Sequence, residues 1–235
     1  MIKASFALSE TGALRNENQD SFLLDETSGL LAVADGLGGL PNGTQASQLA
    51  LEILRKKLAD LPSIDLAQLI AEVNEEARSL GFDLHAAGFG TTLTLVRILP
   101  GPSRLQLGHV GDSSAFLVSD GKVRQLTEEH TVAARMIESQ FEEADDAIPA
   151  SAHHTLTQCI GQELYIDPQI GEFDLKTGDR LFLCSDGVSK PLREGQMQEC
   201  LLMEDSLERI CQSLTFRIEI AGSPDNYTIV AAEFT

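Results

Sequence analysis

Three apolar runs in the sequence each end at an acidic residue beside a glycine. LLAVA ends at Asp35-Gly36, LQLGHVG ends at Asp112, and LFLCS ends at Asp186-Gly187. Short apolar runs that stop at a turn are typical of buried strands. A carboxylate at the tip of a buried strand is costly to ionise unless a positive charge lies close to it. Together with Asp20 and Asp225, these residues predict separate strand ends that share one cluster of cations.

The ligand type narrows the choice of cation. Aspartate supplies oxygen ligands only, which favours Mg²⁺ or Mn²⁺ and argues against zinc. A single Asp-Gly pair is more often an ordinary turn, so the prediction depends on the combination of aspartates. The four cysteines form no Cys-x-x-Cys pair, and three lie within apolar runs. We therefore expect buried free thiols and a reducing compartment.

Composition limits the partners that this chain can have. Its 235 residues include 36 acidic and 17 basic side chains, for a formal net charge of -19. That charge repels the phosphates of nucleic acids and anionic lipids, so we expect neither as a partner. No signal sequence is evident and no apolar run approaches the roughly 18 residues of a membrane span. These features predict a cytoplasmic protein with no membrane span.

Periodicity predicts a mixed arrangement of helices and strands. Apolar spacing indicates helices over 45–61 and 66–80, the second with Asp65 as its N-cap and Gly81 at its end. We expect successive antiparallel strands over 91–99, 104–110, 114–118 and 122–126, with a hairpin turn at Asp120-Gly121. Further elements are strands over 30–34, 180–184 and 227–233 and a helix over 199–214. This order favours α+β layering over a regular βαβ alternation.

Eight blocks of the sequence, in order, resemble the PPM/PP2C-type metal-dependent serine/threonine protein phosphatases, and more closely their compact bacterial branch. The blocks are RNENQD, VADGLGG, GFGTTL, GDSSAFLV, LTEEHT, LTQCIG, LFLCSDGV and PDNYT, and they span nearly the whole chain. The resemblance implies one domain over 1–235, with a flap at about 131–155. It also implies a four-layer α-β-β-α sandwich with two central antiparallel sheets.

The resemblance also implies the roles of individual residues. Asp35 would bridge two Mn²⁺ or Mg²⁺ ions, the Gly36 carbonyl would ligate one, and Asp186 and Asp225 would hold the other. Asp20 would support the water shell of the ions, Asp112 would share a third, weaker ion with Asp186, and Arg15 would bind the substrate phosphate. Two cations can lower the pKa of a water held between them and present hydroxide to phosphorus. A guanidinium suits phosphate because its forked donors are permanently charged.

The sequence departs from the family pattern at several positions. Gln19 stands where glutamate is usual, which removes a negative charge near the ions. Ser114 stands where arginine is common, and we expect that change to affect packing more than chemistry; Glu129 replaces a frequent aspartate. Leu37 stands where some animal members have histidine, so the proton donor stays open. The histidines at 85, 109, 130, 153 and 154 are more often structural or solvated than catalytic.

Other readings of the sequence remain to be weighed. Cys211 and Arg217 have the spacing of cysteine-dependent phosphatases, but no glycines lie between them, and Cys211 fits an apolar helix face. The acidic stretch at 142–146 is typical of a solvated loop, or of a flap that favours phosphopeptides with basic neighbours. The favoured function is hydrolysis of phosphoserine and phosphothreonine on proteins, opposing a bacterial Ser/Thr kinase. The alternative is a catalytically weak binding module of the same fold.

Overall fold

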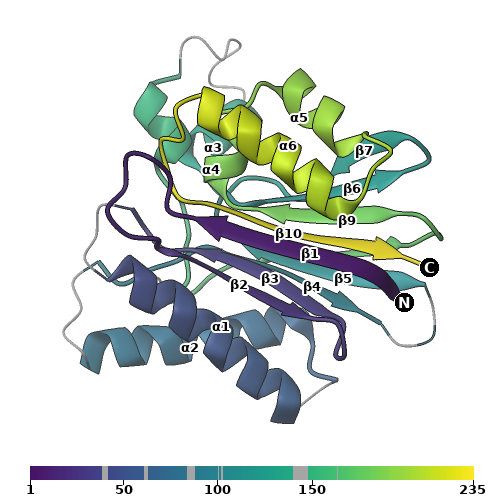
Figure 1. The fold of residues 1–235 in the computed structure, drawn as a ribbon. Coiled ribbons are helices and arrows are strands. Elements are labelled where there is room, and N and C mark those ends of the chain that lie inside the picture. Colours follow the sequence, from purple (N-terminus) through teal and green to yellow (C-terminus); the bar gives the residue numbers. More distant parts are fainter. Residues whose placement is uncertain are drawn as a thin grey trace.

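The protein is a layered structure in which two β-sheets pack face to face between two groups of helices (Figure 1). The computed structural model describes residues 1–38, 42–60, 63–83, 88–99, 101, 103–139, 148–162 and 164–235. Every pairing between neighbouring strands is antiparallel. No helix in these ranges has both the length and the apolar character needed to cross a lipid bilayer.

The first sheet joins the two ends of the chain. Its order is β1-β10-β9-β6-β7. The bounds are Ile2–Glu10 for β1, Tyr227–Phe234 for β10, Arg180–Cys184 for β9, Ser114–Ser119 for β6 and Lys122–Gln125 for β7. Helices α4, α5 and α6, over Asp186–Ser189, Glu194–Leu201 and Leu207–Ile220, cover its outer face.

The second sheet is built mainly from the first half of the chain. Its order is β2-β3-β4-β5-β8. The bounds are Asp20–Asp25 for β2, Leu30–Asp35 for β3, Leu93–Ile98 for β4, Arg104–Val110 for β5 and Gln169–Asp174 for β8. Helices α1 and α2, over Gly43–Asp60 and Leu66–Asp83, cover its outer face.

Strand β3 shows why the apolar runs are continuous. Leu31 and Val33 point into the core between the two sheets, whereas Leu30, Ala32 and Ala34 pack against the helices α1 and α2. Because successive side chains of a strand point to opposite faces, a strand buried on both faces needs an apolar residue at every position. Strand β9 in the first sheet is buried on both faces in the same way.

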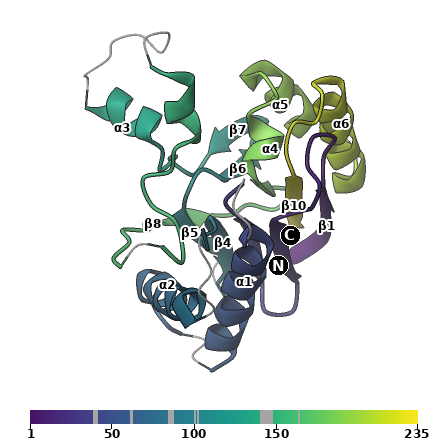
Figure 2. The ribbon, with the colours of Figure 1, turned by 90° about the vertical axis from the view of Figure 1, so that its left-hand side faces the viewer.

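A smaller unit stands apart from the sandwich (Figure 2). Helix α3, Val132–Glu138, and a 3-10 turn over Ala150–His154 pack around their own small cluster of Ala133, Ile148 and Ala152. Thr131 caps α3, because its side chain accepts a hydrogen bond from the backbone N–H of Ala134 at 3.1 Å. This unit falls in the segment predicted as a flap, and the acidic stretch at 142–146 lies outside the described residues.

Two predictions about connections are wrong. The strands over 104–110 and 114–118 were expected to be neighbours, but β5 and β6 lie in different sheets. The chain crosses between the sheets at Gly111, whose φ of +113° turns the backbone sharply. The helix expected over 199–214 is two helices, because Ser206 caps α6 by accepting from the backbone N–H of Arg209 at 3.3 Å.

The predicted turns and caps are otherwise mostly confirmed. Asp120 and Gly121 have φ of +51° and +69° and join β6 to β7 as a tight hairpin. Asp65 caps α2 by accepting from the backbone N–H of Ala67 at 2.9 Å. Gly81 does not end α2, which continues to Asp83. A Cβ at Gly81 would lie 2.7 Å from the Phe89 ring, so the glycine serves close packing.

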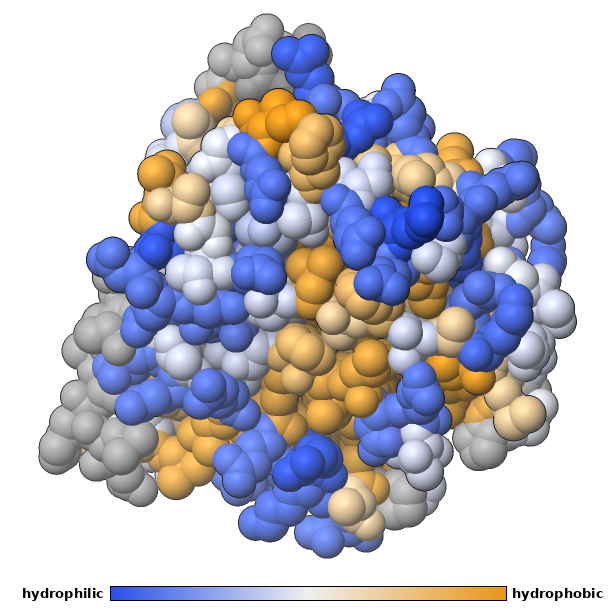
Figure 3. Space-filling model, in the orientation of Figure 1, coloured by the Kyte–Doolittle hydropathy of each residue, from blue (hydrophilic) through white to orange (hydrophobic). Residues whose placement is uncertain are grey.

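The surface differs from the core in composition. Figure 3 shows hydrophobic residues gathered near the middle of one face, around the edge strands β1 and β2, with hydrophilic residues around them.

The described cysteines at 159, 184, 200 and 211 are all buried and free, as predicted. Cys211 lies on the buried face of α6 and packs into the core, which argues against a role as a nucleophile.

Candidate metal and phosphate site

Antiparallel pairing brings the predicted aspartates to one end of the sandwich. Asp20 begins β2 directly opposite Asp35, the last residue of β3. Asp186 begins α4 just after β9, and Asp225 comes two residues before β10, which pairs with β9. In an antiparallel pair the end of one strand lies beside the start of its neighbour. Residues distant in the sequence therefore meet at a single edge.

A cavity of about 240 Å³, here called the site cavity, opens at that edge. Its lining is Arg15, Asp35, Gly36, Leu37, Gly38, Thr92, Asp112, His154, Leu156, Asp186, Asp225 and Asn226. All the residues predicted for the site line it except Asp20, which lies buried. The structure thus brings together carboxylates from both sheets.

Asp20 is a buried carboxylate with one oxygen satisfied. Its Oδ2 accepts hydrogen bonds from Ser185 Oγ and Thr228 Oγ1, each at 2.7 Å. Its Oδ1 has no hydrogen-bond donor among the described residues. Burial raises the pKa of Asp20 to about 6, although the two hydroxyl donors oppose that rise. A buried oxygen without a donor indicates that another group, such as a cation or its water, belongs there.

Asp35 is held rigidly at the end of β3. Its backbone N–H donates to Thr92 Oγ1 at 2.9 Å, and its carbonyl accepts from the Thr92 N–H at 2.8 Å. Burial raises the pKa of Asp35 well above its usual value, and the nearby carboxylates of Asp20 and Asp186 raise it further. Like charges in a desolvated place favour protons or cations. This electrostatic conflict is what a divalent ion would relieve.

Gly36 follows Asp35 where no side chain fits. A Cβ at this position would lie 2.3 Å from the Gly43 carbonyl oxygen and 2.8 Å from that of Gln19. The Gly36 N–H donates to the Gln19 carbonyl at 3.1 Å, which holds the backbone against the start of β2. Gly36 also lines the site cavity, so its backbone lies where a carbonyl ligand is predicted.

Arg15 forms an ion pair with one of the predicted metal ligands. Its Nη2 lies 2.6 Å from Asp225 Oδ2, while Asp225 Oδ1 accepts from the Asn226 N–H at 2.8 Å. The side chain passes close to Gly38, where an added Cβ would lie 3.2 Å from the guanidinium. Both groups line the site cavity, so the predicted phosphate-binding residue and a predicted ligand are direct neighbours.

Lys190 is a residue of the site that the sequence analysis did not identify. Its Nζ lies 2.6 Å from Asp112 Oδ2 and 2.7 Å from Asp186 Oδ2. His154 Nδ1, from the 3-10 turn beside α3, lies 3.4 Å from the same ammonium. The available signal was the four-residue spacing between Asp186 and Lys190, which brings such side chains together on a helix.

Asn226 is a second residue whose role the sequence analysis did not identify. Its Nδ2 donates to the carbonyls of Thr11 and Glu17 at 2.6 and 2.9 Å, and its Oδ1 accepts from the Gln19 N–H at 2.9 Å. These bonds tie the loop that carries Arg15 to the start of β10. The asparagine thereby fixes Arg15 close to Asp225.

The positions that depart from the family pattern lie beside the site. Gln19 is buried, and its Nε2 donates to Glu17 Oε1 at 2.8 Å rather than facing the site cavity. Ser114 is buried in β6, where its Oγ accepts from Gln125 Nε2 at 3.5 Å. Leu37 lines the site cavity and supplies no proton there.

The described histidines divide into core and site residues. His109 is fully buried in β5, where Nδ1 bonds to Thr94 Oγ1 at 2.8 Å and Nε2 bonds to the Glu128 carbonyl at 3.1 Å. Burial lowers the pKa of His109 to about 3, so it is a neutral structural residue. His154 lines the site cavity, whereas His85 lies outside the described residues.

The chemistry of the ligand atoms at the site fits divalent ions. Carboxylates, the unpartnered Asp20 Oδ1 and the bare backbone at Gly36 are the chemistry that Mg²⁺ and Mn²⁺ bind. Yet within the described ranges no three His, Cys, Asp or Glu side chains stand grouped closely enough to hold an ion. Arg15 and Lys190 engage the carboxylates of Asp225, Asp186 and Asp112 instead.

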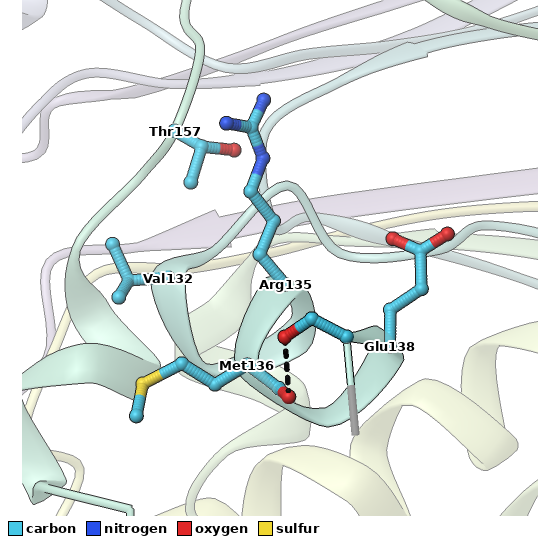
Figure 4. A pocket seen from close by; sticks show the side chains of 6 residues that line it. Val132, Arg135, Met136, Glu138 and Thr157 are labelled. Atoms are coloured by element: carbon cyan, nitrogen blue, oxygen red, sulfur yellow. Dashed lines mark hydrogen bonds between the residues drawn. The ribbon is translucent and has the colours of Figure 1, made fainter. Parts of the chain in front are cut away.

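A second cavity lies beside α3, outside this site. It has a volume of about 700 Å³ and is lined by Val132, Arg135, Met136, Glu138, Ser139 and Thr157. Figure 4 shows the side chains of Val132 and Met136 beside those of Arg135 and Thr157. None of the aspartates predicted as metal ligands lines it. Its lining residues therefore give no reason to place a metal and phosphate site there.

Comparison with known proteins identifies the family of this chain. The family described as Protein phosphatase 2C matches residues 14–219. The chain is 33% identical, over 97% of its length, to the "Serine/threonine protein phosphatase PstP" of Mycobacterium tuberculosis strain H37Rv, and it spans 44% of that relative.

Two crystal structures are similar over almost all of both chains. The PPM Ser-Thr phosphatase MsPP from Mycobacterium smegmatis, in complex with cacodylate, has a TM-score of 0.87 at 30% identity, covering 100% of this chain and 99% of that one. The catalytic domain of PstP in complex with 2 manganese ions has a TM-score of 0.81 at 30% identity, covering 98% and 97%. The predicted fold is confirmed, and this chain belongs to the protein phosphatase 2C family.

Proposed function

We propose that this chain is a metal-dependent phosphatase that hydrolyses phosphoserine and phosphothreonine in proteins. The observation that carries the proposal is the convergence of Asp35, Asp186 and Asp225 on one cavity that also contains Arg15. Carboxylates and a guanidinium in one small cavity suit the joint binding of divalent cations and a phosphate group. Family membership and the manganese-bound PstP structure support the same reading.

The ions would be held by the carboxylates and one backbone carbonyl. In this proposal the carboxylates of Asp35, Asp186 and Asp225 and the Gly36 carbonyl would hold the two ions. Asp20, with its unpartnered Oδ1, supports their water shell. When bound, Mn²⁺ or Mg²⁺ would supply charge stabilisation at the phosphoryl group and activate water.

Arg15 is the group proposed to bind the phosphate. It lines the site cavity and is held close to Asp225 by the loop that Asn226 anchors. Asp225 keeps the guanidinium oriented across the cavity until a phosphate offers it a second set of acceptor oxygens. A forked, permanently charged group then binds two phosphoryl oxygens at once and orients the ester for attack.

The size of the site cavity favours the end of a side chain over a whole cofactor. Pockets for drug-sized ligands usually measure about 300–1,000 Å³. At about 240 Å³, the site cavity can admit a phosphorylated side chain while the rest of a protein substrate stays outside. This supports phosphoproteins as the substrate class, with a bacterial Ser/Thr kinase and its targets as the proposed partners. The free, buried cysteines support a cytoplasmic location for this pairing.

The alternative is a weakly catalytic binding module of the same fold. A module that had lost catalysis would not need the proposed ligands, and this chain keeps Asp35, Asp186 and Asp225 at one cavity. The decisive experiment is hydrolysis of p-nitrophenyl phosphate and of a phosphothreonine peptide, with and without Mn²⁺. We expect release that requires the metal in both assays. Folded protein without metal-stimulated release would favour the binding module.

A matched variant tests the ligand assignment within that assay. Asp186→Asn removes a carboxylate charge at nearly constant volume, so we expect a folded protein with turnover lowered on the order of 100-fold or more. Asp205→Asn, at the exposed start of α6, is the control, because Asp205 is not among the lining residues of the site cavity. Unchanged turnover in the Asp186 variant would disprove the assignment.

A further inference from the structure

The ammonium of Lys190 forms ion pairs with two carboxylates of the site. Lys190 Nζ contacts Asp112 Oδ2 at 2.6 Å and Asp186 Oδ2 at 2.7 Å. The Asp112 side chain is only 7% exposed and that of Lys190 is 22% exposed. Ion pairs this far from solvent are weakly screened, and removing one partner leaves an uncompensated buried charge.

The backbone fixes Lys190 in this place. Its N–H donates to the Asp186 carbonyl at 2.9 Å, within the short helix α4. Val188, in the same helix, is fully buried against the core under the first sheet. The backbone of Lys190 is therefore held in place, and its side chain has less conformational freedom than that of an exposed lysine.

Lys190 has no substitute as the counter-ion of Asp112. Among the described residues, no other lysine or arginine forms an ion pair with Asp112. A lysine ammonium carries a positive charge at neutral pH. Lys190 therefore balances the charge of the Asp112 carboxylate in the absence of a metal ion.

A divalent ion and this ammonium compete for the same oxygen. Oxygen ligands lie about 2.0–2.6 Å from Mg²⁺ or Ca²⁺, while Lys190 Nζ already lies 2.6 Å from Asp112 Oδ2. Two cations in contact with one carboxylate oxygen repel each other strongly in a desolvated place. An ion between Asp112 and Asp186 could bind the two Oδ2 atoms only after Lys190 had moved away from both of them.

We propose that Lys190 is a built-in cation that replaces a third metal ion between Asp112 and Asp186, so that this chain binds two divalent ions and not three. The inference rests on the proposed function, because it assumes the two-ion site at Asp35, Asp186 and Asp225. The ion pair uses Oδ2 of Asp186 and leaves Oδ1 outside the pair. Lys190 is thereby a positioning residue that holds Asp112 and Asp186 in place.

His154 extends this arrangement to the unit that carries α3. Its Nδ1 lies 3.4 Å from the Lys190 ammonium and its residue lines the site cavity. A neutral imidazole nitrogen can accept from an ammonium, whereas a divalent ion in that place would demand a different set of ligands. The lysine therefore links the turn beside α3 to the carboxylates without a metal ion.

The experiment counts Mn²⁺ ions per chain by equilibrium dialysis and elemental analysis, with calorimetric titration for the affinities. The variants are Lys190→Met, which keeps the length and removes the charge, and Lys3→Met as control. Lys3 pairs with Glu233 at 2.5 Å, neither residue lines the site cavity, and the loss of Lys3 changes the net charge by the same amount. We expect two ions in the wild-type protein and in the control, and a third, weaker ion in Lys190→Met.

A double variant and a wild-type crystal close the test. Lys190→Met with Asp112→Asn should return to two ions, because it removes the oxygen that holds the third. Manganese anomalous scattering from wild-type crystals should show no ion on Asp112, a result that does not depend on any variant folding. Three ions in the wild-type protein, or no gain in a folded Lys190→Met, would overturn the inference alone. No ion in the wild-type protein would overturn the proposed function as well.

Discussion

The core between the two sheets and the carboxylate end of the same sandwich are built from opposite kinds of contact. Leu31, Val33 and Leu183 lie between the sheets among apolar side chains only, and each is fully buried. At the neighbouring ends of β2 and β3, Asp20 is buried and Asp35 is half-buried, but each lies beside other carboxylates. Burial stabilises the first group and raises the free energy of the second.

The difference shows which part of the molecule depends on a partner. The core between the sheets is a cluster of apolar side chains, so it has no charge that an outside group must offset. At the carboxylate end, Arg15 and Lys190 neutralise some of the charge, and Asp20 Oδ1 still lacks a donor. Strain of this kind persists only where the rest of the fold enforces it, and it is common at functional sites. The stable core therefore holds the carboxylates close together although they repel one another.

The largest expected effect comes from removing one charge at the carboxylate end. In Asp35→Asn we expect metal-stimulated turnover to fall on the order of 100-fold or more, since a central ligand is lost. The metal-free protein should melt at a higher temperature than the wild type, because a desolvated like charge has gone. Turnover and thermal melting in EDTA measure the two effects. A lower melting temperature with normal turnover would contradict the comparison.

A core substitution should show the reverse pattern. Leu31→Ala removes a fully buried side chain between the sheets, and we expect a loss of about 2–5 kcal/mol in the free energy of unfolding. Turnover per folded molecule should stay near that of the wild type, because Leu31 does not line the site cavity. Denaturant unfolding and assays well below the transition test this. Loss of turnover in protein that remains folded would show that core and site are not separable.

The variant Arg15→Lys tests whether the guanidinium of Arg15 binds the substrate phosphate. The ammonium keeps the charge but cannot form two parallel hydrogen bonds, so we expect KM for a phosphopeptide to rise about 10-fold with a smaller change in kcat. Arg104→Lys, in an exposed ion pair with Asp174, is the control and should change neither constant. Equal kinetics in the Arg15 and Arg104 variants would remove Arg15 from the phosphate site.

The smallest effect is a pH dependence of opposite sign in the two regions. Asp20 has a pKa of about 6, above its ordinary 3.8, so the metal-free folded state binds its proton more tightly and loses stability as pH rises from about 4 to 6. His109 has a pKa of about 3, below its ordinary 6.5, so its contribution is present above pH 6.5 and is lost as pH falls towards 3.

Asp20→Asn isolates the contribution of the site. At pH 4 the wild-type carboxyl is protonated and resembles the amide, whereas at pH 7 it carries a buried charge that the variant lacks. The melting temperature of metal-free Asp20→Asn, minus that of the wild type, should therefore be larger at pH 7 than at pH 4. Scanning calorimetry at both values measures it. An identical difference at the two pH values would show that Asp20 is not held at a raised pKa.

Much of the fold could be predicted where local pattern and tertiary burial agree. The helices at α1 and α2 have apolar residues at helical spacing, and β3 and β9 are continuous apolar runs. Strands β1, β2 and β8 were not predicted, and all three are edge strands. β8 has alternating partly buried and exposed residues that include Glu172 and Asp174. Edge strands carry a weaker signal, since only one neighbour and one face constrain them.

The sequence by itself determined the family and the identity of the aspartates at the site, because both depend on residue types in a fixed order. Only the tertiary structure decided what those aspartates touch. The pairing of Arg15 with Asp225 joins residues 210 positions apart, and that of Lys190 with Asp112 spans 78. Such contacts arise from how two sheets pack and where the chain crosses between them. No local pattern encodes those distances, so the charges that balance the site became visible only in three dimensions.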